Sequence, residues 1–453
     1  MPTNLISIGR SGAAAAKASI EVTAQNIANA SNPDYVRRSL QLSEFVGAAR
    51  IDFQSSSSLA GVRIGGIDRP NSELIQRRAR DSASDLQRAE AELSGLRDAE
   101  TALEQSGLFR GLVDYEAALR VLEGDPTDLA LRTGALESAR QLAQTFQLAD
   151  FSLGNARQLV EDDVNVGVDA INGAARELAR INVELANVRS GTAAQASLLD
   201  ARDAALRDIS SEFGTITRFD EFGAAEVRLV GTPLPAGESG LLLVEGDKFS
   251  ELTAQIDPQG SASFSFGGAA FAPLSGAMAG RASALTDLAG RQSVLDAIAS
   301  QTITQANNAQ ASGAALDGSD GQPLFTGSDA GTIALALMRG EDLALAPAGS
   351  PPGSRNTANL SNMLAVFGAD DGPIASTDRL LLALSSKISG IETTREGLAI
   401  INSSAQADLL TETGVDLDAE AASLIRLQQA FEANSRIIQV AGELFDTILG
   451  LSR

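Results

Sequence analysis

The N-terminal segment of the chain carries a small, mostly apolar stripe whose spacing alternates between three and four residues. The stripe consists of Ile6, Gly9, Ala13, Ala16, Ile20, Thr23, Ile27 and Ala30. This alternation is typical of a coiled-coil seam, and its small residues would let a neighbouring helix approach closely. It predicts a helix from Asn4 to Asn29, about 40 Å long at about 1.5 Å per residue. The helix should stop near Asn32-Pro33, because a residue before proline is pushed out of the helical region.

The C-terminal segment repeats this spacing over a longer stretch. Its stripe consists of Leu417, Ala421, Leu424, Gln428, Phe431, Ser435, Ile438, Gly442, Phe445 and Leu449. A second stripe of Ile425, Ile437, Val440, Leu444, Ile448 and Leu451 widens the apolar face. Asp416 or Asp418 is expected to cap the helix. Two stripes on one helix predict contacts on both sides, as in a multi-helix assembly.

Either stripe alone is explained equally well by ordinary packing within one chain. Stripes at both extreme ends favour assembly between subunits. We therefore predict an assembly interface at the two ends, formed by Ile6, Ala13, Ile20, Asn26, Ile27, Asn29, Leu417, Leu424, Gln428, Phe431, Ile438, Phe445 and Leu449.

Composition narrows the class of protein. The chain has 453 residues, of which 44% are hydrophobic and only 4% aromatic. A core made mainly from Leu, Ile, Val and Ala favours helices. The net charge of −23 disfavours nucleic acid as a partner, because phosphate binding needs concentrated Lys and Arg. Cysteine and histidine are both missing, which excludes disulfides, Ser-His-Asp catalysis and zinc sites built on those residues. No cofactor or metal is expected.

Two targeting features are not predicted. The N-terminus lacks a basic region followed by a continuous apolar run, so no cleaved secretory signal is expected. No segment approaches about 18 uninterrupted apolar residues, so no membrane insertion is expected.

The middle of the chain alternates between helical and strand-like texture. Helices are predicted over 71–105, from an Asp125-Pro126 start through Leu185, and over 198–213, 278–311 and 378–411. Short apolar runs between Gly, Pro and Asp predict strands over 214–273. Turns or loops are predicted at 317–321 and 347–352.

This layout predicts a mainly α protein with a small β insert. Its parts would be paired terminal coiled-coil helices (1–35 and 412–453), a long-helix bundle domain (36–213 and 276–411) and an outer β-rich domain (214–275).

Two acidic stretches are candidate reactive sites. Asp200 and Asp203 lie three residues apart on one helix face and could form an acid/base pair if one carboxyl lay in a cleft. A surface ion pair or cap near Arg202 and Arg207 is the favoured interpretation, because acidic pairs on helices are common. The stretch 317–321 faintly resembles a calcium loop but lacks the alternating ligands and the distal Glu, which favours a plain turn.

Both ends resemble the bacterial flagellar axial family of rod, hook and hook-associated proteins. At the N-terminus the resemblance rests on Ser11-Gly12-Ala13 and on Thr23–Tyr35, which reads TAQNIANASNPDY against the family's NNIANANTPGY. Gln25 stands where the family has its first Asn, and Asp34 where it has Gly. At the C-terminus Gly414–Ala422, GVDLDAEAA, is similar to GVNLDEEAA, and the likeness continues through Leu427–Ile438 and Phe445–Leu449.

The middle resembles hook-associated proteins of the FlgK type. The similar parts are Asp125-Pro126 with Leu131-Arg132, then 174–185, 198–203, Asn307–Gln310 and Pro323–Gly327. The weakly similar parts are 214–273 and 347–377. The resemblance implies a structural protein, not an enzyme, that polymerises as a junction between hook and filament, adapts one to the other and enables filament assembly.

The resemblance also implies a set of partners and a location. The partners would be other copies of the chain, hook protein, a FlgL-type junction protein, a cytoplasmic export chaperone and the type III export apparatus. The protein would be cytoplasmic before export and extracellular in the flagellum afterwards. Terminal helices that cannot bury their stripes alone are expected to be mobile before assembly. A hook or distal-rod protein is the alternative within the family, and a flagellum-associated carboxylate hydrolase is the alternative from another class.

Overall fold

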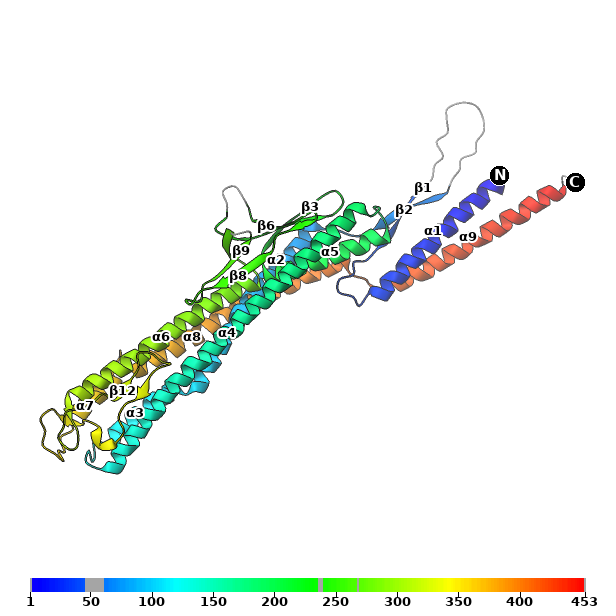
Figure 1. The fold of residues 1–453 in the computed structure, drawn as a ribbon. Helices are drawn as coiled ribbons and strands as arrows, with labels where there is room; N and C mark the ends of the chain where they lie inside the picture. The colour runs from blue at the N-terminus through cyan, green and yellow to red at the C-terminus, as the bar shows by residue number, and fades with distance from the viewer. Residues whose placement is uncertain (1, 45–60, 235–238, 267–268, 452–453) are drawn as a thin grey trace.

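The computed structural model describes residues 2–44, 61–234, 239–266 and 269–451. The molecule is elongated (Figure 1). A pair of helices, α1 (Pro2–Asn29) and α9 (Leu417–Leu451), forms one end and carries both chain termini at its tip. The long helices α2 (Glu73–Ser106), α4 (Leu129–Asn187), α6 (Ala277–Ala311) and α8 (Pro373–Thr413) form the body. Among the described residues the mainly α fold class is confirmed, as are the predicted long helices and the strand-rich stretch over 214–273.

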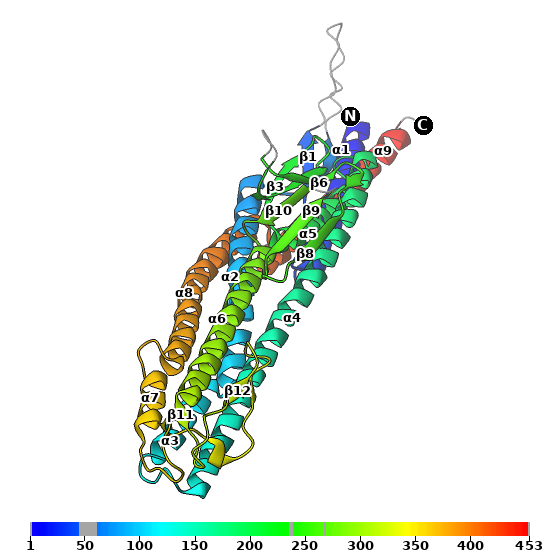
Figure 2. The same cartoon turned by 60° about the vertical axis from the view of Figure 1, so that its left-hand side comes forward.

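Helix α4 runs the length of the body along one of its sides and is the longest of the described helices (Figure 2). Its 59 residues correspond to roughly 90 Å at about 1.5 Å per residue. The predicted start at Asp125-Pro126 is wrong. The Asp125 carboxylate instead accepts hydrogen bonds from the backbone and hydroxyl of Thr127, which closes a turn. Asp128 is the N-cap and accepts from the amides of Ala130 and Leu131 at 2.7 and 3.0 Å.

The core follows the four long helices through the body. α4 contributes a buried stripe with apolar residues such as Leu142, Phe146 and Ile181, none of which is exposed. Helix α2 packs against α4, α6 and α8 along its length. At the end of the body far from the termini, α3 (Leu108–Val121) and α7 (Ala358–Phe367) complete the bundle, and Tyr115 packs edge-on against Phe367 with ring centroids 5.3 Å apart.

Two small antiparallel sheets lie beside α4, α5 (Ala193–Glu212) and α6. In one sheet the order is β3 (Thr215–Phe219), β4 (Ala225–Leu229), β6 (Leu241–Glu245), β7 (Lys248–Phe249); in the other it is β5 (Gly231–Thr232), β10 (Ala269–Pro273), β9 (Ala262–Phe266), β8 (Leu252–Ile256). Two buried asparagines of α4 hold the sheets. Asn172 exchanges two hydrogen bonds with the Leu252 backbone, and Asn182 does the same with Ala225.

Short strands at the far end of the body were not predicted from the sequence. β11 (Gly313–Ala314) pairs with β14 (Ala346–Pro347), and β12 (Phe325–Thr326) pairs with β13 (Ala334–Leu335). A one-turn 3-10 helix, η1, covers Gly340–Asp342. Asn307 of α6 accepts from the amides of Leu324 and Phe325 and donates to the Phe325 carbonyl. Asn307, which belongs to the FlgK-like sequence pattern, therefore holds the backbone of Leu324 and Phe325 in place through its side-chain amide.

A β-hairpin that was also missed lies against α1. Its strands are β1 (Ser39–Glu44) and β2 (Val62–Asp68), and the Val62 amide donates to the Ser11 hydroxyl of α1 at 3.1 Å. Both strands fall within the range 36–213 that was predicted to belong to the helical bundle domain, and in the structure they contact α1. The described helices include none with the length and apolar character needed to cross a membrane.

Candidate assembly site

The terminal helices pack against each other antiparallel, through glycines of α1. A Cβ added at Gly9 would lie 2.8 Å from the Ile438 side chain, and one added at Gly12 would lie 2.4 Å from the Asn434 side chain. A side chain at either position would force Ile438 or Asn434 to shift, so the glycines permit the close approach of the two helices. The predicted α1 stripe is buried or half-buried throughout. The expectation that neither helix can bury its stripe within one chain is therefore wrong for α1, because α9 and the β1–β2 hairpin cover it.

Helix α9 leaves large apolar side chains partly uncovered on both sides of the positions that face α1. Seven large side chains on it are between 39 and 56% exposed, and we call them the α9 outer face: Leu417, Ile425, Phe431, Ile437, Val440, Leu444 and Phe445. Residues facing inward on α9 repeat every seven positions instead at Glu420, Leu427, Asn434 and Ala441, all buried or half-buried. The inward seam is thus displaced by one residue from the predicted stripe. The prediction followed apolar residues, whereas two of the seam positions, Glu420 and Asn434, are polar.

The thirteen predicted interface residues divide into two groups. On α1, Asn26 is buried, and Ile6, Ala13, Ile20, Ile27 and Asn29 are half-buried. On α9, Leu424 and Ile438 are half-buried, whereas Leu417, Gln428, Phe431 and Phe445 are exposed. Leu449 lies outside the residues whose side chains are described. Their role in assembly stays a prediction.

Between the helix pair and the body lies a segment that we call the neck, comprising 30–38, 69–76, 197–207 and 413–420. Asn26 at the end of α1 organises its first part. The Asn26 side-chain oxygen accepts from the Tyr35 hydroxyl at 2.8 Å and from the Arg38 amide at 3.0 Å, and its nitrogen donates to the Arg38 carbonyl at 2.8 Å. In the segment Thr23–Tyr35, which resembles the family motif, the chain thus folds back on α1. The fold is held by the side-chain amide of Asn26, a residue that is 1% exposed.

Arg37 connects this returning loop to the start of α9. Its guanidinium donates to the Glu420 carboxylate at 2.7 Å, and its amide donates to the Thr413 carbonyl at the end of α8 at 2.9 Å. Glu420 is 1% exposed. Asp416 caps α9 by accepting from the amides of Asp418 and Ala419, which decides between the two predicted caps. The first and last helices are therefore fixed to each other at the neck.

A buried ion network then fixes the neck to the body. Asp200 of α5 accepts from Arg38 at 2.7 Å and from Arg69, which follows β2, at 2.8 Å. Asp203 accepts from Arg69 at 2.7 Å and from Arg202 at 2.6 Å. The three arginine side chains are 1 to 6% exposed. Arg202 also donates to the Gly223 carbonyl at 2.6 Å and stacks 4.3 Å above the Phe219 ring, which ties the β3 sheet to the neck.

This network corrects the interpretation of Asp200 and Asp203 as a surface pair. Burial raises the pKa of Asp203, but the charges of Arg202 and Arg69 outweigh burial and hold that pKa below its usual value. A general acid needs a raised pKa near neutral pH. Asp203 therefore stays ionised and serves as an ion-pair partner. Burial lowers the pKa of Arg202, with Asp203 opposing the shift.

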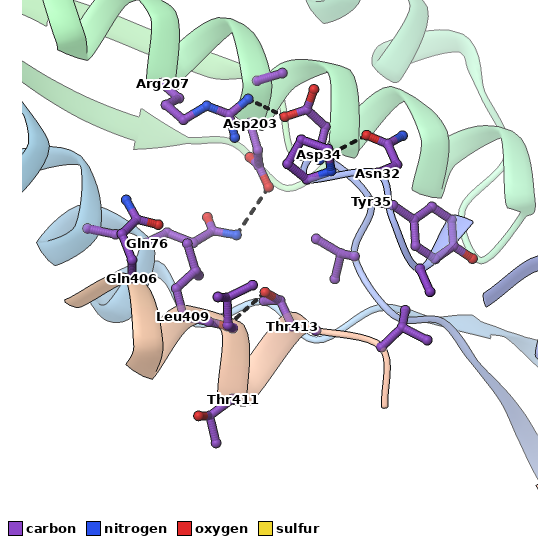
Figure 3. A pocket seen from close by; sticks show the side chains of 18 of the residues that line it. Asn32, Asp34, Tyr35, Gln76, Asp203, Arg207, Gln406, Leu409, Thr411 and Thr413 are labelled. Carbon is purple, nitrogen blue, oxygen red and sulfur yellow. Dashed lines mark hydrogen bonds and ion pairs between the residues drawn. The ribbon is translucent and has the colours of Figure 1, made fainter. Parts of the chain in front are cut away.

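A cavity of ≈ 560 Å³ opens in the neck beside this network (Figure 3). Its walls come from the loop after α1, from α2 and α5, and from the end of α8. Figure 3 shows Asp34 bonded to Arg207, and Asp203 bonded to Gln76, at its edge. Within the described part of the chain, no group of three or more His, Cys, Asp or Glu side chains is placed to hold a metal.

Sequence reasoning missed most of the neck. The glycines at 9 and 12 belonged to the predicted stripe or motif, so the signal for a close approach was available. The sequence did not indicate the ion pairs of Arg37, Arg38 and Arg69, because their partners Glu420 and Asp200 are more than a hundred residues away.

Comparison with known proteins places this architecture among flagellar components. A family profile described as the flagellar hook-associated protein FlgK helical domain matches residues 96–325, which is 230 of the 453 residues. A second profile, the flagellar basal body rod FlgEFG protein C-terminal, matches residues 408–451. The first covers most of the body, and the second covers α9 and the last residues of α8.

Curated relatives agree with these profiles. The flagellar hook-associated protein 1 of Bacillus subtilis (strain 168) is 22% identical, over 97% of this chain and 96% of that protein. The protein of the same name from Escherichia coli (strain K12) is 24% identical over 56% of this chain, which spans 45% of that longer relative. The flagellar hook junction protein FlgK of Burkholderia pseudomallei is a solved structure with 24% identity and a TM-score of 0.43, covering 53% of this chain and 46% of that one.

Proposed function

Because the chain belongs to the FlgK family of flagellar hook-associated proteins, we propose that it is a structural subunit of the junction between hook and filament. In this role it polymerises with other copies of itself as a thin zone, acts as a mechanical adaptor and enables filament assembly on the hook. Features of α9 and of the neck support this proposal.

The α9 outer face carries the proposal. Its seven apolar side chains are spread along α9 from the neck to the tip and stay 39 to 56% exposed in the single chain. Large apolar side chains exposed along one helix favour an interaction site. The neck supports the same role, because buried ion pairs and the Asn26 hydrogen bonds join the helix pair to the body at several points. A load on the helix pair is thereby passed to the long helices.

The partners follow from the same position in the flagellum. We propose that the α9 outer face and the α1 positions predicted from sequence contact neighbouring copies, the hook protein on one side and a FlgL-type junction protein on the other. Export through the type III apparatus, with a cytoplasmic chaperone bound near α9, would bring the chain to its extracellular site. An uncovered α9 face fits a chaperone that shields it before export.

Deletion of the gene in the native bacterium, followed by electron microscopy, tests the role. The expected result is cells with bare hooks, no filaments and flagellin in the medium. Cells without hooks would instead assign the chain to the rod or hook, which is the alternative within the family. Normal filaments would contradict both assignments.

Point variants in the deleted strain connect the role to the α9 outer face. Replacing Ile425 and Phe431 by Ser should restore few or no filaments, because both side chains lie on the exposed apolar face. The matched control replaces exposed Gln429 and Gln439 by Ser on the same helix, since neither belongs to the predicted interface or to the α9 outer face. Equal filament numbers in the two strains would show that the face has no part in assembly.

A further inference from the structure

The ion network and the cavity wall beside it hold more arginines than carboxylates. Arg38, Arg69 and Arg202 of the network and Arg80 on the wall lie around two carboxylates, Asp200 and Asp203, whereas buried Glu420 has its own partner in Arg37. Arg38, Arg69 and Arg202 are each paired with one or both carboxylates. Buried charges are normally paired, because removing an ion from water is costly without a counter-ion. The unmatched charge falls on Arg80.

Arg80 lies on α2 and lines the neck cavity. It is 7% exposed, and its guanidinium makes neither a hydrogen bond nor an ion pair with any part of the chain that the structure describes. Burial lowers its pKa, and the charges of Asp203, Asp81 and Glu73 oppose this while Arg202 adds to it. None of these acidic groups is within ion-pair distance of it. Arg80 is therefore a largely buried cation on the cavity wall.

The cavity around Arg80 suits a carboxylate on a short aliphatic stem. Apolar side chains such as Val36, Ala79 and Leu409 form much of its wall, and its volume of ≈ 560 Å³ exceeds that of one side chain. The carboxylates that line it are already bonded. Asp203 is held by Arg69 and Arg202, and Asp34 by Arg207. Asp416 accepts from the first amides of α9.

We propose that an Asp or Glu side chain of a second copy of this chain enters the cavity and binds Arg80. This inference rests on the proposed function, because it requires subunits to assemble. Two observations favour a second copy over a free acid. The cavity lining reaches Asp416, directly before Leu417 at the start of α9, and Leu410 on the lining and Leu417 are 64 and 53% exposed. The chain itself is acidic, with 58 Asp and Glu against 35 Lys and Arg, so another copy offers many carboxylates.

The test uses Arg80→Met, which keeps an unbranched stem and removes the charge. Arg78→Met is the matched control, because Arg78 is on the same helix with a side chain 71% exposed. The purified Arg80→Met monomer should melt at the wild-type temperature or above it, since an unpaired buried charge is lost. Glutarate, used as a carboxylate probe, should raise the melting temperature of the wild type and of Arg78→Met but not of Arg80→Met.

Cross-linking in assembled flagella identifies the occupant. Gln406, which lines the cavity, is replaced by the photo-reactive residue p-benzoylphenylalanine. Irradiation should give a dimer of this chain, cross-linked to a peptide that contains Asp or Glu. Arg80→Met should lower the dimer yield at least about tenfold, equivalent to about 1.4 kcal/mol of binding free energy, and Arg78→Met should not.

Several outcomes would overturn the inference. These are an unchanged dimer yield in Arg80→Met, a cross-link to a different protein, a glutarate effect without any dimer, and no glutarate effect in the wild type. A wild-type dimer yield in Arg80→Met cells that grow normal filaments would reject this site and leave the junction role intact. Cells of the deletion strain that lack hooks would reject the junction role instead.

Discussion

The body and the terminal pair are both made of long helices, but they bury their side chains very differently. In α4, 22 of 59 residues are buried. In α9, among the 31 of its residues whose burial is described, only Glu420 and Ala441 are buried. The body is thus a finished structure with its own core. The pair is held by a seam of small residues and by the neck, and leaves large apolar side chains in water.

This difference indicates that the surface available for binding other subunits lies on α9. Apolar area buried within a chain cannot also be buried against a neighbour. In α9 the exposed Phe431, Ile437 and Leu444 lie three residues from the seam positions Asn434 and Ala441, so they flank the seam and remain partly uncovered. The outer face is then available for other subunits, and the neck supplies the fixation that the seam lacks.

The largest effect should come from equal truncations in the two regions. Phe146→Ala in the body should lower the free energy of unfolding by about 3–5 kcal/mol, because the side chain is fully buried. Phe431→Ala on the α9 outer face should change it by less than about 1 kcal/mol, because 39% of that residue is exposed. Urea denaturation of the purified monomers measures both. Similar losses in the two variants would mean that the regions do not differ as described.

Removing one carboxylate of the ion network should have the next largest effect. Asp203→Asn leaves Arg69 and Arg202 underpaired, and we expect a loss of about 3 kcal/mol, at the low end for a buried pair because the Asp203 side chain is 17% exposed. Asp162→Asn, on the exposed side of α4, is the control and should stay within about 0.5 kcal/mol. Thermal unfolding compares the two. A neutral Asp203→Asn would show that the network does not support the fold.

A bulkier seam should separate the terminal pair and leave the body intact. Gly9→Leu places atoms where Ile438 and the Asn434 carbonyl already lie. Limited proteolysis should then cut α1 and α9 several times faster, while the melting temperature of the body changes little. Gly442→Ala is the control, because a Cβ there meets nothing within 4 Å and alanine favours a helix by about 1 kcal/mol. Unchanged proteolysis of Gly9→Leu would contradict close packing of the pair.

The smallest effect should be the pH dependence of the neck. The folded pKa of Asp203 is below its unfolded value, so its stabilising contribution is fully present above the unfolded pKa of about 3.9. That contribution is lost as the pH falls through the lower, folded pKa. The difference in stability between wild type and Asp203→Asn should therefore be constant above about pH 5 and shrink below about pH 4. A difference that shrinks near neutral pH would contradict an ionised, arginine-bound Asp203.

The sequence predicted what depends on local patterns. Helical periodicity identified α1, α2, α4, α5, α6, α8 and α9, and the Gly- and Pro-rich texture identified the strands after α5. It placed the start of α4 too early, because Asp125-Pro126 and Asp128 offer two similar caps three residues apart. The β1–β2 hairpin was missed, since its two strands are separated by many residues and lack a short turn signal.

The neck could not be predicted in the same way. Its contacts join residues far apart in the chain, such as Arg37 to Glu420 and Arg38 to Asp200. Nothing local distinguishes these arginines from others on the surface. The α9 seam lies one residue away from the predicted stripe, because apolar spacing does not indicate a seam that includes the polar Glu420 and Asn434. The family motif singled out Asn26 as part of a similar segment, but it did not indicate the hydrogen bonds that Asn26 makes with Tyr35 and Arg38.

The pairing of α1 with α9 also sets an order of folding. Contacts within α4, or between consecutive strands, close short loops, whereas Gly9 must find Ile438 across more than 400 residues of chain. Closing so long a loop is slow unless intervening structure has already shortened it. The body should therefore fold first and bring the two ends together at the neck. The pair closes last, so a nascent or truncated chain has a folded body before it has a completed tip.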